Sequence, residues 1–123
     1  MPLRYVLDEN VRGLLWRAIE RYNRRTGYPI NAVRVGDLTE LPRGTRDRDL
    51  LMWAERENSI IISLDVNTMP RHLHDHLESG HHSPGLFLLV GRMNLFALLE
   101  FLSLAAYASD PEEWRDRVEF VNC

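Results

Sequence analysis

The chain has 123 residues, of which 45% are hydrophobic, and its formal net charge is −3 at pH 7. This length is enough for one domain with a buried core and too short for two. The slight negative charge argues against a protein whose whole surface binds nucleic acid, so only local basic patches could have that role. We therefore treat residues 1–123 as a single domain.

All fifteen basic residues are arginine, and the absence of lysine excludes two kinds of site. A Walker-type phosphate loop needs a lysine after its glycines, and Schiff-base chemistry needs a lysine amine. The only cysteine is Cys123, which excludes an intramolecular disulfide and a thiolate metal site. With no signal peptide and no apolar stretch of the ~20 residues that cross a bilayer, we expect a cytoplasmic protein that does not enter a membrane.

Short runs of branched apolar residues alternate with amphipathic stretches along the chain. The apolar runs predict five strands, over residues 3–7, 30–35, 59–64, 85–90 and 118–121. The amphipathic stretches predict helices from residue 11 to before Gly27, over residues 47–57 and over residues 95–108, with a further helix start at residues 109–113. This alternation is typical of an α/β fold with a mainly parallel sheet.

Two of the predicted strands end in a carboxylate. Asp8 directly follows the first strand and Asp65 follows the third. In a parallel α/β sheet, ligands bind beyond the carboxyl ends of the strands, and neighbouring strands lie about 4.8 Å apart. If these two strands are neighbours, their terminal carboxylates can share one cation.

A third acid, Asp47, begins the second predicted helix, and the loop over residues 36–46 can bring it over the same edge of the sheet. Carboxylates that lie together repel one another, and Mg²⁺ with its oxygen ligands offsets that repulsion. The alternative is that these residues only cap helices. Asp8 or Asn10 would cap the first helix, Thr45 or Asp47 the second, and Asp49 also lies in a first turn where acids are favoured.

The ordered motifs of the chain resemble a known family. The segment Leu7-Asp8-Glu9-Asn10-Val11 resembles the opening motif of PIN-like domains. It is followed in order by VRVGDL at 33–38, TRDRDLL at 45–51, ISLDVN at 62–67 and SPGLFLL at 83–89. The set is similar to the small bacterial PIN-like proteins grouped as DUF5615, over residues 3–90.

This resemblance implies a three-layer α/β/α fold and a nuclease site that uses Mg²⁺ or Mn²⁺, often in the toxin of a toxin–antitoxin pair. By position, Asp8, Asp47 and Asp65 would be the acidic metal ligands. The chain departs from the pattern at Asn67, where relatives commonly have a second aspartate, so one negative charge is missing. Glu9 would either restore that charge or point outward.

Arginines surround the predicted acidic site. Arg43, Arg46 and Arg48 flank Asp47 and could bind RNA phosphates in a bidentate manner, or could belong to a solvated helix start. On the last predicted helix, Phe96 and Phe101 fall on the exposed side, which would suit an antitoxin or a second copy in a homodimer.

Histidines are concentrated between residues 71 and 83, at positions 72, 74, 76, 81 and 82. His72 and His76 have the i,i+4 spacing of a zinc-binding helix, but no glutamate stands where such a helix needs one. We predict a polar loop or lid with incidental metal affinity, and a dedicated zinc site is the minority alternative.

Three functions compete at this point. The leading prediction is a metal-dependent endoribonuclease, and the second is a PIN-like module that binds RNA or protein with little catalysis, which Asn67 would permit. The third is a phospho-receiver domain, which also has acids after its first and third strands. It ranks last because a receiver needs a lysine after a later strand.

Overall fold

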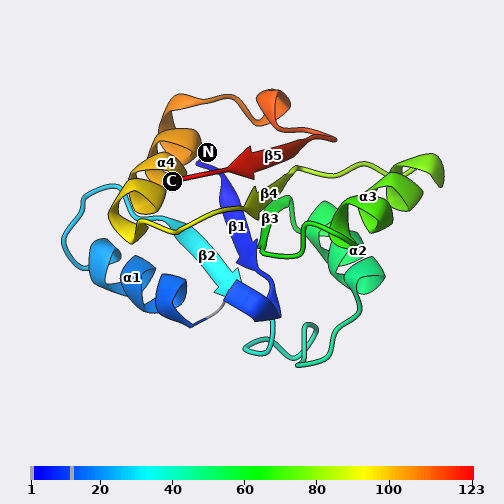
Figure 1. Ribbon diagram of the computed structural model, residues 1–123, viewed down its shortest axis with the longest axis horizontal. Coiled ribbons are helices and arrows are strands. Elements are labelled where there is room, and N and C mark those ends of the chain that lie inside the picture. Colours follow the sequence, from blue (N-terminus) through cyan, green and yellow to red (C-terminus); the bar gives the residue numbers. More distant parts are fainter. Residues whose placement is uncertain (1, 12) are drawn as a thin grey trace.

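The computed structural model describes residues 2–11 and 13–123 (Figure 1). Within them, five parallel strands form one sheet in the order β2-β1-β3-β4-β5. The strands are β1 (Arg4–Leu7), β2 (Asn31–Arg34), β3 (Ser59–Ser63), β4 (Leu86–Leu89) and β5 (Val118–Val121). The helices are α1 (Leu14–Asn23), α2 (Asp47–Arg56), α3 (Met69–Glu78) and α4 (Leu95–Ala108), with 3₁₀ turns η1 (Glu9–Val11) and η2 (Pro111–Glu113). The predicted three-layer α/β/α architecture is confirmed.

The sheet has a hydrophobic core on each face, because alternate strand residues point to opposite sides. Tyr5 and Leu7 of β1 face the core that contains α1 and α4. Val6, between them, faces the core that contains α2 and α3. Figure 1 shows these two helix pairs on opposite sides of the sheet. No helix in the described part of the chain is long and apolar enough to span a bilayer.

One crossover of the fold has the opposite hand to the others. Helices α3 and α4 each connect a strand to the next strand in the same direction across the sheet, yet they pack on opposite faces. The β3–α3–β4 and β4–α4–β5 crossovers therefore differ in hand. Helix α1 lies on the same face as α4 but connects β1 to β2 in the opposite direction across the sheet, so the β1–α1–β2 crossover has the same hand as β3–α3–β4. Since about 98% of such units are right-handed, β4–α4–β5 is the left-handed one.

Residues 71–78 of the histidine-rich segment are helical, so the prediction of a loop or lid is wrong for them; residues 79–83, with His81 and His82, are turn and loop. Helix α3 covers Met69–Glu78, with Pro70 in its first turn and the apolar residues Met69 and Leu73 on its buried side. Gly80, at φ 88°, ends the helix in the left-handed conformation that glycine favours. The sequence contains the apolar i,i+4 spacing of Met69 and Leu73, the proline of the first turn and the glycine after the helix end. The polar histidines between them concealed this helical pattern.

Two details at the C-terminal side also differ from expectation. Phe101 is partly buried, because its ring packs on Phe87 and Trp114 at centroid distances of 5.4 and 6.3 Å. Phe96 is 79% exposed as predicted. The helix start predicted at residues 109–113 is only the single turn η2, although its capping box between Asp110 and Glu113 is formed.

Helix α4 is fixed to the sheet by a buried hydrogen bond. The Tyr5 hydroxyl donates to the Leu102 carbonyl at 2.8 Å, and burial raises the pKa of Tyr5 above its ordinary value of 10.0. The folded state therefore keeps this proton at a pH where the unfolded chain has lost it. Stability from this group is complete below pH 10 and declines as the pH rises above it.

We expect Tyr5→Phe to lower the free energy of unfolding at pH 7 by about 1 kcal/mol, the usual worth of one hydrogen bond. Above pH 10, the wild type should lose up to about 1.4 kcal/mol per pH unit that the variant does not lose. Urea unfolding at several pH values measures both effects. Tyr22→Phe is the matched control, since that partly buried hydroxyl donates to Ser103 Oγ. An alkaline slope in Tyr5→Phe as steep as in wild type would contradict the assignment.

Candidate functional site

The acidic site lies where the chain direction across the sheet reverses. Strand β1 is paired with β2 on one side and with β3 on the other, with Leu7 opposite Ile62 in the β1–β3 register. In doubly wound sheets this switch point opens a crevice at the carboxyl ends of the strands. Asp8 follows β1 and Asp65 comes two residues after β3, so the prediction that their strands are neighbours is confirmed.

Ser63 connects the two aspartates. Its hydroxyl donates to Asp8 Oδ2 at 2.8 Å and accepts from the Asp65 backbone N–H at 3.0 Å. Ser63 is the last residue of β3 and is fully buried, so this hydroxyl is fixed in place. The bond to Asp8 orients one oxygen of that carboxylate at the sheet edge.

Asp8 ionises less readily than an ordinary aspartate. Burial raises its pKa most, the hydrogen bonds from Ser63 and from the Glu9 N–H lower it, and the charges of Asp65 and Glu9 raise it again. The net pKa is raised. A cation next to Asp8 would stabilise its ionised form, because a positive charge offsets the cost of burying the carboxylate and its repulsion by Asp65 and Glu9.

Asp47, in the first turn of α2, is predicted to face the same edge. Burial raises its pKa most, and the charges of Asp8 and Asp65 raise it further, which fits that position. The opposing contribution comes from His72, whose Nε2 lies 3.7 Å from Asp47 Oδ2. The first turns of α2 and α3 therefore both face the acidic edge.

The loop that carries Asp47 to this edge is tied down by Glu9. Glu9 Oε1 accepts a hydrogen bond from the Gly44 N–H at 2.8 Å, across 35 residues of chain. Of the two roles considered for Glu9, a metal ligand or an outward-pointing residue, the structure supports neither simply. Glu9 holds the loop through Oε1, so it does not simply point outward.

Asp65 serves the start of α3. Its oxygens accept from the Asn67 N–H at 3.2 Å, from the Thr68 N–H at 2.9 Å and from the Thr68 hydroxyl. The Thr68 hydroxyl bond and then the Thr68 amide hold the pKa of Asp65 below its ordinary value. Asn67, predicted as a neutral ligand, has an exposed side chain.

The predicted caps differ from the observed ones. Asn10 does not cap α1, which begins after Gly13; its Oδ1 accepts from the Leu64 N–H at 3.2 Å and so ties η1 to the end of β3. Helix α2 begins after Arg46 with no side-chain cap, so neither Thr45 nor Asp47 has that role. Asp49 is exposed in the first turn of α2. Because the 3₁₀ helix η1 follows β1, α1 begins at Leu14 and not at the predicted residue 11. The spacing of apolar residues alone did not reveal this difference.

The arginines predicted to bind phosphate are exposed. Arg46 and Arg48 line a groove of about 630 Å³ between α2 and α3, together with His72 and Asp49. Arg43 is exposed in the loop before α2. The groove runs from the guanidinium groups of Arg46 and Arg48 between α2 and α3 toward His76 and His81.

The three aspartates do not lie as close as ligands of a single ion. Among the described residues, the group of three acidic or histidine side chains whose ligand atoms all lie within 4.8 Å of one another is Glu55, His76 and His81. Direct ligation of one ion by Asp8, Asp47 and Asp65 would therefore require these side chains to move together, or a water molecule to bridge one of them.

Sequence reasoning missed two members of this site. Ser63 is the last residue of β3, beside Asp8 at the end of the neighbouring strand, and a polar residue at the end of an otherwise apolar strand is the signal that could have indicated it. His72 lies one turn into α3 and could be placed only once that segment was known to be a helix.

Comparison with protein-family models, with curated proteins and with solved structures found no match to this chain. Its function must therefore be inferred from its own residues.

We expect Ser63→Ala to raise the pKa of Asp8, because the variant removes a hydrogen bond that favours the carboxylate. Stability should fall by about 1–2 kcal/mol, since Asp8 and the Asp65 amide lose a buried partner. NMR titration of the Asp8 carboxyl carbon and urea unfolding measure the two effects. Ser59→Ala is the control, because Ser59 is equally buried in β3 but donates to the Glu57 carbonyl. An unchanged pKa of Asp8 in Ser63→Ala would refute the linkage.

Proposed function

We propose that the protein is a metal-dependent ribonuclease that holds Mg²⁺ or Mn²⁺ at the carboxyl edge of β1 and β3. The observation that carries this proposal is that Asp8, Asp47 and Asp65 act on one another at this edge: burial first, and then the charges of the neighbouring carboxylates, raise the pKa of Asp8 and Asp47. Without a cation, such an arrangement destabilises the fold. A divalent cation offsets the repulsion.

The donor set fits a hard cation. All three side chains offer carboxylate oxygens, which suit Mg²⁺ and Mn²⁺ better than softer metals. Each carboxylate oxygen has two lone pairs, so an oxygen that already accepts one hydrogen bond can still bind a cation. Asp8, bonded to Ser63 and to the Glu9 amide, is thus held in one orientation while ligand capacity remains.

The residues around the acids would perform the other tasks of a nuclease. When bound, the cation would polarise a phosphodiester oxygen and activate a water molecule. Arg46 and Arg48 would bind flanking phosphates along the groove. His72, beside Asp47, would attract phosphate when protonated.

The resemblance of the ordered motifs to PIN-like toxins supports RNA as the substrate, the cytoplasm as the place of action, and an antitoxin as the partner. The exposed Phe96 of α4 would be part of the surface that meets an antitoxin or a second copy of the chain.

Cleavage of single-stranded RNA with Mg²⁺ or Mn²⁺, and its loss with EDTA, is the direct test. We expect Asp8→Asn to reduce the rate by at least about a hundredfold, because it removes an anionic ligand. The same variant should unfold at equal or higher urea concentration at pH 7. The sign follows from the raised pKa of Asp8: ionisation in the folded state is opposed, so stability declines as pH rises through the folded pKa.

Glu119→Gln is the control for that experiment, since Glu119 is exposed on the edge strand β5, on the far side of β4 from the site. Cleavage that continues in Asp8→Asn, or that does not depend on added metal, would contradict the proposal.

A second function is favoured by two observations: the oxygens of Asp65 are engaged by the start of α3, and the three carboxylates are not within single-ion distance of one another. Both suit a module that binds RNA or a protein without efficient catalysis. The strand order is also that of receiver domains, but the chain has no lysine for that chemistry.

Asn67→Asp separates the first two functions. The added carboxylate at the edge should tighten Mn²⁺ binding by about tenfold if a metal site exists there. Isothermal titration calorimetry measures the affinity, with Asn31→Asp, exposed at the amino end of the edge strand β2, as a control that adds the same charge at the other edge of the sheet. Equal, negligible binding of Mn²⁺ by wild type and Asn67→Asp would favour the binding module.

A further inference from the structure

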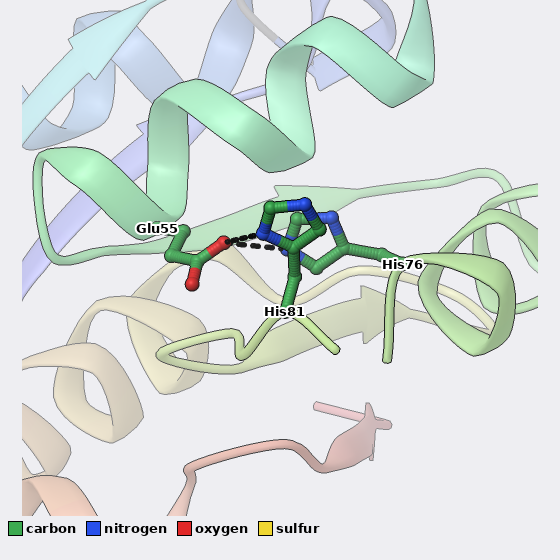
Figure 2. Close-up of side chains that lie close together, drawn as sticks. All are labelled: Glu55, His76 and His81. Atoms are coloured by element: carbon green, nitrogen blue, oxygen red, sulfur yellow. Dashed lines mark ion pairs between the residues drawn. The ribbon is translucent and has the colours of Figure 1, made fainter. Parts of the chain in front are cut away.

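Three ligand-type side chains meet at the opposite edge of the sheet from the acidic site. Glu55 belongs to the last turns of α2, His76 to the last turn of α3, and His81 to the loop that leads to β4. Glu55 Oε1 lies 3.0 Å from His76 Nε2 and 3.1 Å from His81 Nδ1. Figure 2 shows both imidazole rings directed at the same carboxylate oxygen.

The fold explains why these residues meet. Helices α2 and α3 both return from the carboxyl edge of the sheet to its amino edge, and they pack against each other. Their last turns therefore lie side by side, which brings Glu55 next to His76.

The helix end then turns the chain back on itself. The Gly80 N–H donates to the Leu77 carbonyl and the His81 N–H to the His76 carbonyl, the paired bonds of a Schellman motif. This motif stacks the His81 ring on the His76 ring, with centroids 4.8 Å apart and an interplanar angle of 16°.

The neighbouring residues hold the ligand atoms in place. His76 is the most enclosed, with 4% of its side chain exposed, and its Nε2 also lies 3.0 Å from the His82 carbonyl, a contact that a bound ion would replace. The His82 N–H donates to Glu55 Oε2 at 3.1 Å, which leaves Oε1 turned toward the imidazoles. The His82 ring is itself engaged by Asp116 at 2.9 Å, so it orients the loop and does not compete as a ligand.

We propose that Glu55, His76 and His81 form a binding site for a Zn²⁺ ion. Two imidazole nitrogens and one carboxylate oxygen are a donor set that zinc uses, with metal–ligand distances of about 2.0–2.2 Å. In a tetrahedral site those distances place neighbouring ligand atoms about 3.3 Å apart. The 3.0 and 3.1 Å distances from Glu55 Oε1 are close to this value, and the two imidazole nitrogens lie within 4.8 Å of each other. The stacked imidazole rings would have to tilt for both nitrogens to point at one ion, which side-chain rotation can supply.

The remaining ligand position faces the groove between α2 and α3, which His76 and His81 both line. Water can occupy that position. The ion would join the ends of two helices and the loop before β4, with each imidazole bound through the nitrogen that now faces Glu55 Oε1.

This site is separate from the acidic edge. Glu55 lies eight residues beyond Asp47 on α2, about 12 Å along the helix axis. The zinc proposal therefore does not depend on the proposed nuclease function.

The test is calorimetric titration of the tag-free protein with ZnCl₂. We expect one tight site in wild type and in Asp8→Asn, and affinity at least tenfold weaker in Glu55→Gln and in His81→Gln. His74→Gln is the matched control, because His74 is on the same helix but 71% exposed and paired with Glu78. It should bind as wild type does. His76→Gln is a further ligand variant. If this variant does not fold because His76 is buried, the results for Glu55→Gln and His81→Gln are sufficient to test the proposal.

A second measurement identifies the ligand atoms. In ¹⁵N-histidine spectra, Zn²⁺ should shift Nε2 of His76 and Nδ1 of His81, and leave His72 and His74 unchanged. No binding by wild type, unweakened binding in Glu55→Gln and His81→Gln, or equal loss in His74→Gln would each overturn the proposal. In those cases the three residues are only an ion-pair network.

Discussion

The constraint on which this molecule depends is the burial of β3. All five of its residues are buried, and it is hydrogen-bonded to β1 on one side and to β4 on the other. A strand with no exposed face must have helices above and below, and each helix must return the chain to the amino edge before the next parallel strand begins. The two candidate sites lie at the two edges where those returns start and end.

The left-handed crossover follows from the same need to cover both faces. With α2 and α3 on one face, a right-handed path would have placed α4 there as well, leaving Phe87 and Leu89 of β4 uncovered on the other. Instead α4 packs beside α1, and its buried residues Leu98 and Leu102 complete that core. Tyr5, through its bond to Leu102, joins the helix to β1. Burial of apolar area stabilises the fold, so covering this face of β4 can offset the usual preference for a right-handed crossover.

The sequence was sufficient to predict the sheet and most helices, because branched apolar runs and i,i+3/i+4 spacing are local signals. It also placed Asp8 and Asp65 on neighbouring strands. The sequence did not reveal which residue each polar side chain contacts. The bond from Glu9 to Gly44 spans 35 residues, and the role of Asp65 at the start of α3 depends on a helix that the histidines concealed. Such contacts arise from tertiary packing, which no local pattern records.

The histidine cluster illustrates the same limit. The predicted pair, His72 and His76, is spaced for one helix face, but the glutamate that such a motif requires comes from another helix. Glu55 is 21 positions before His76 in the chain, and the second imidazole is His81, which follows the helix end. Spacing rules detect sites built on one element. A site assembled from two helix ends and a turn is found only when the fold has brought those ends together, which here is a direct consequence of parallel helices on one face of a parallel sheet.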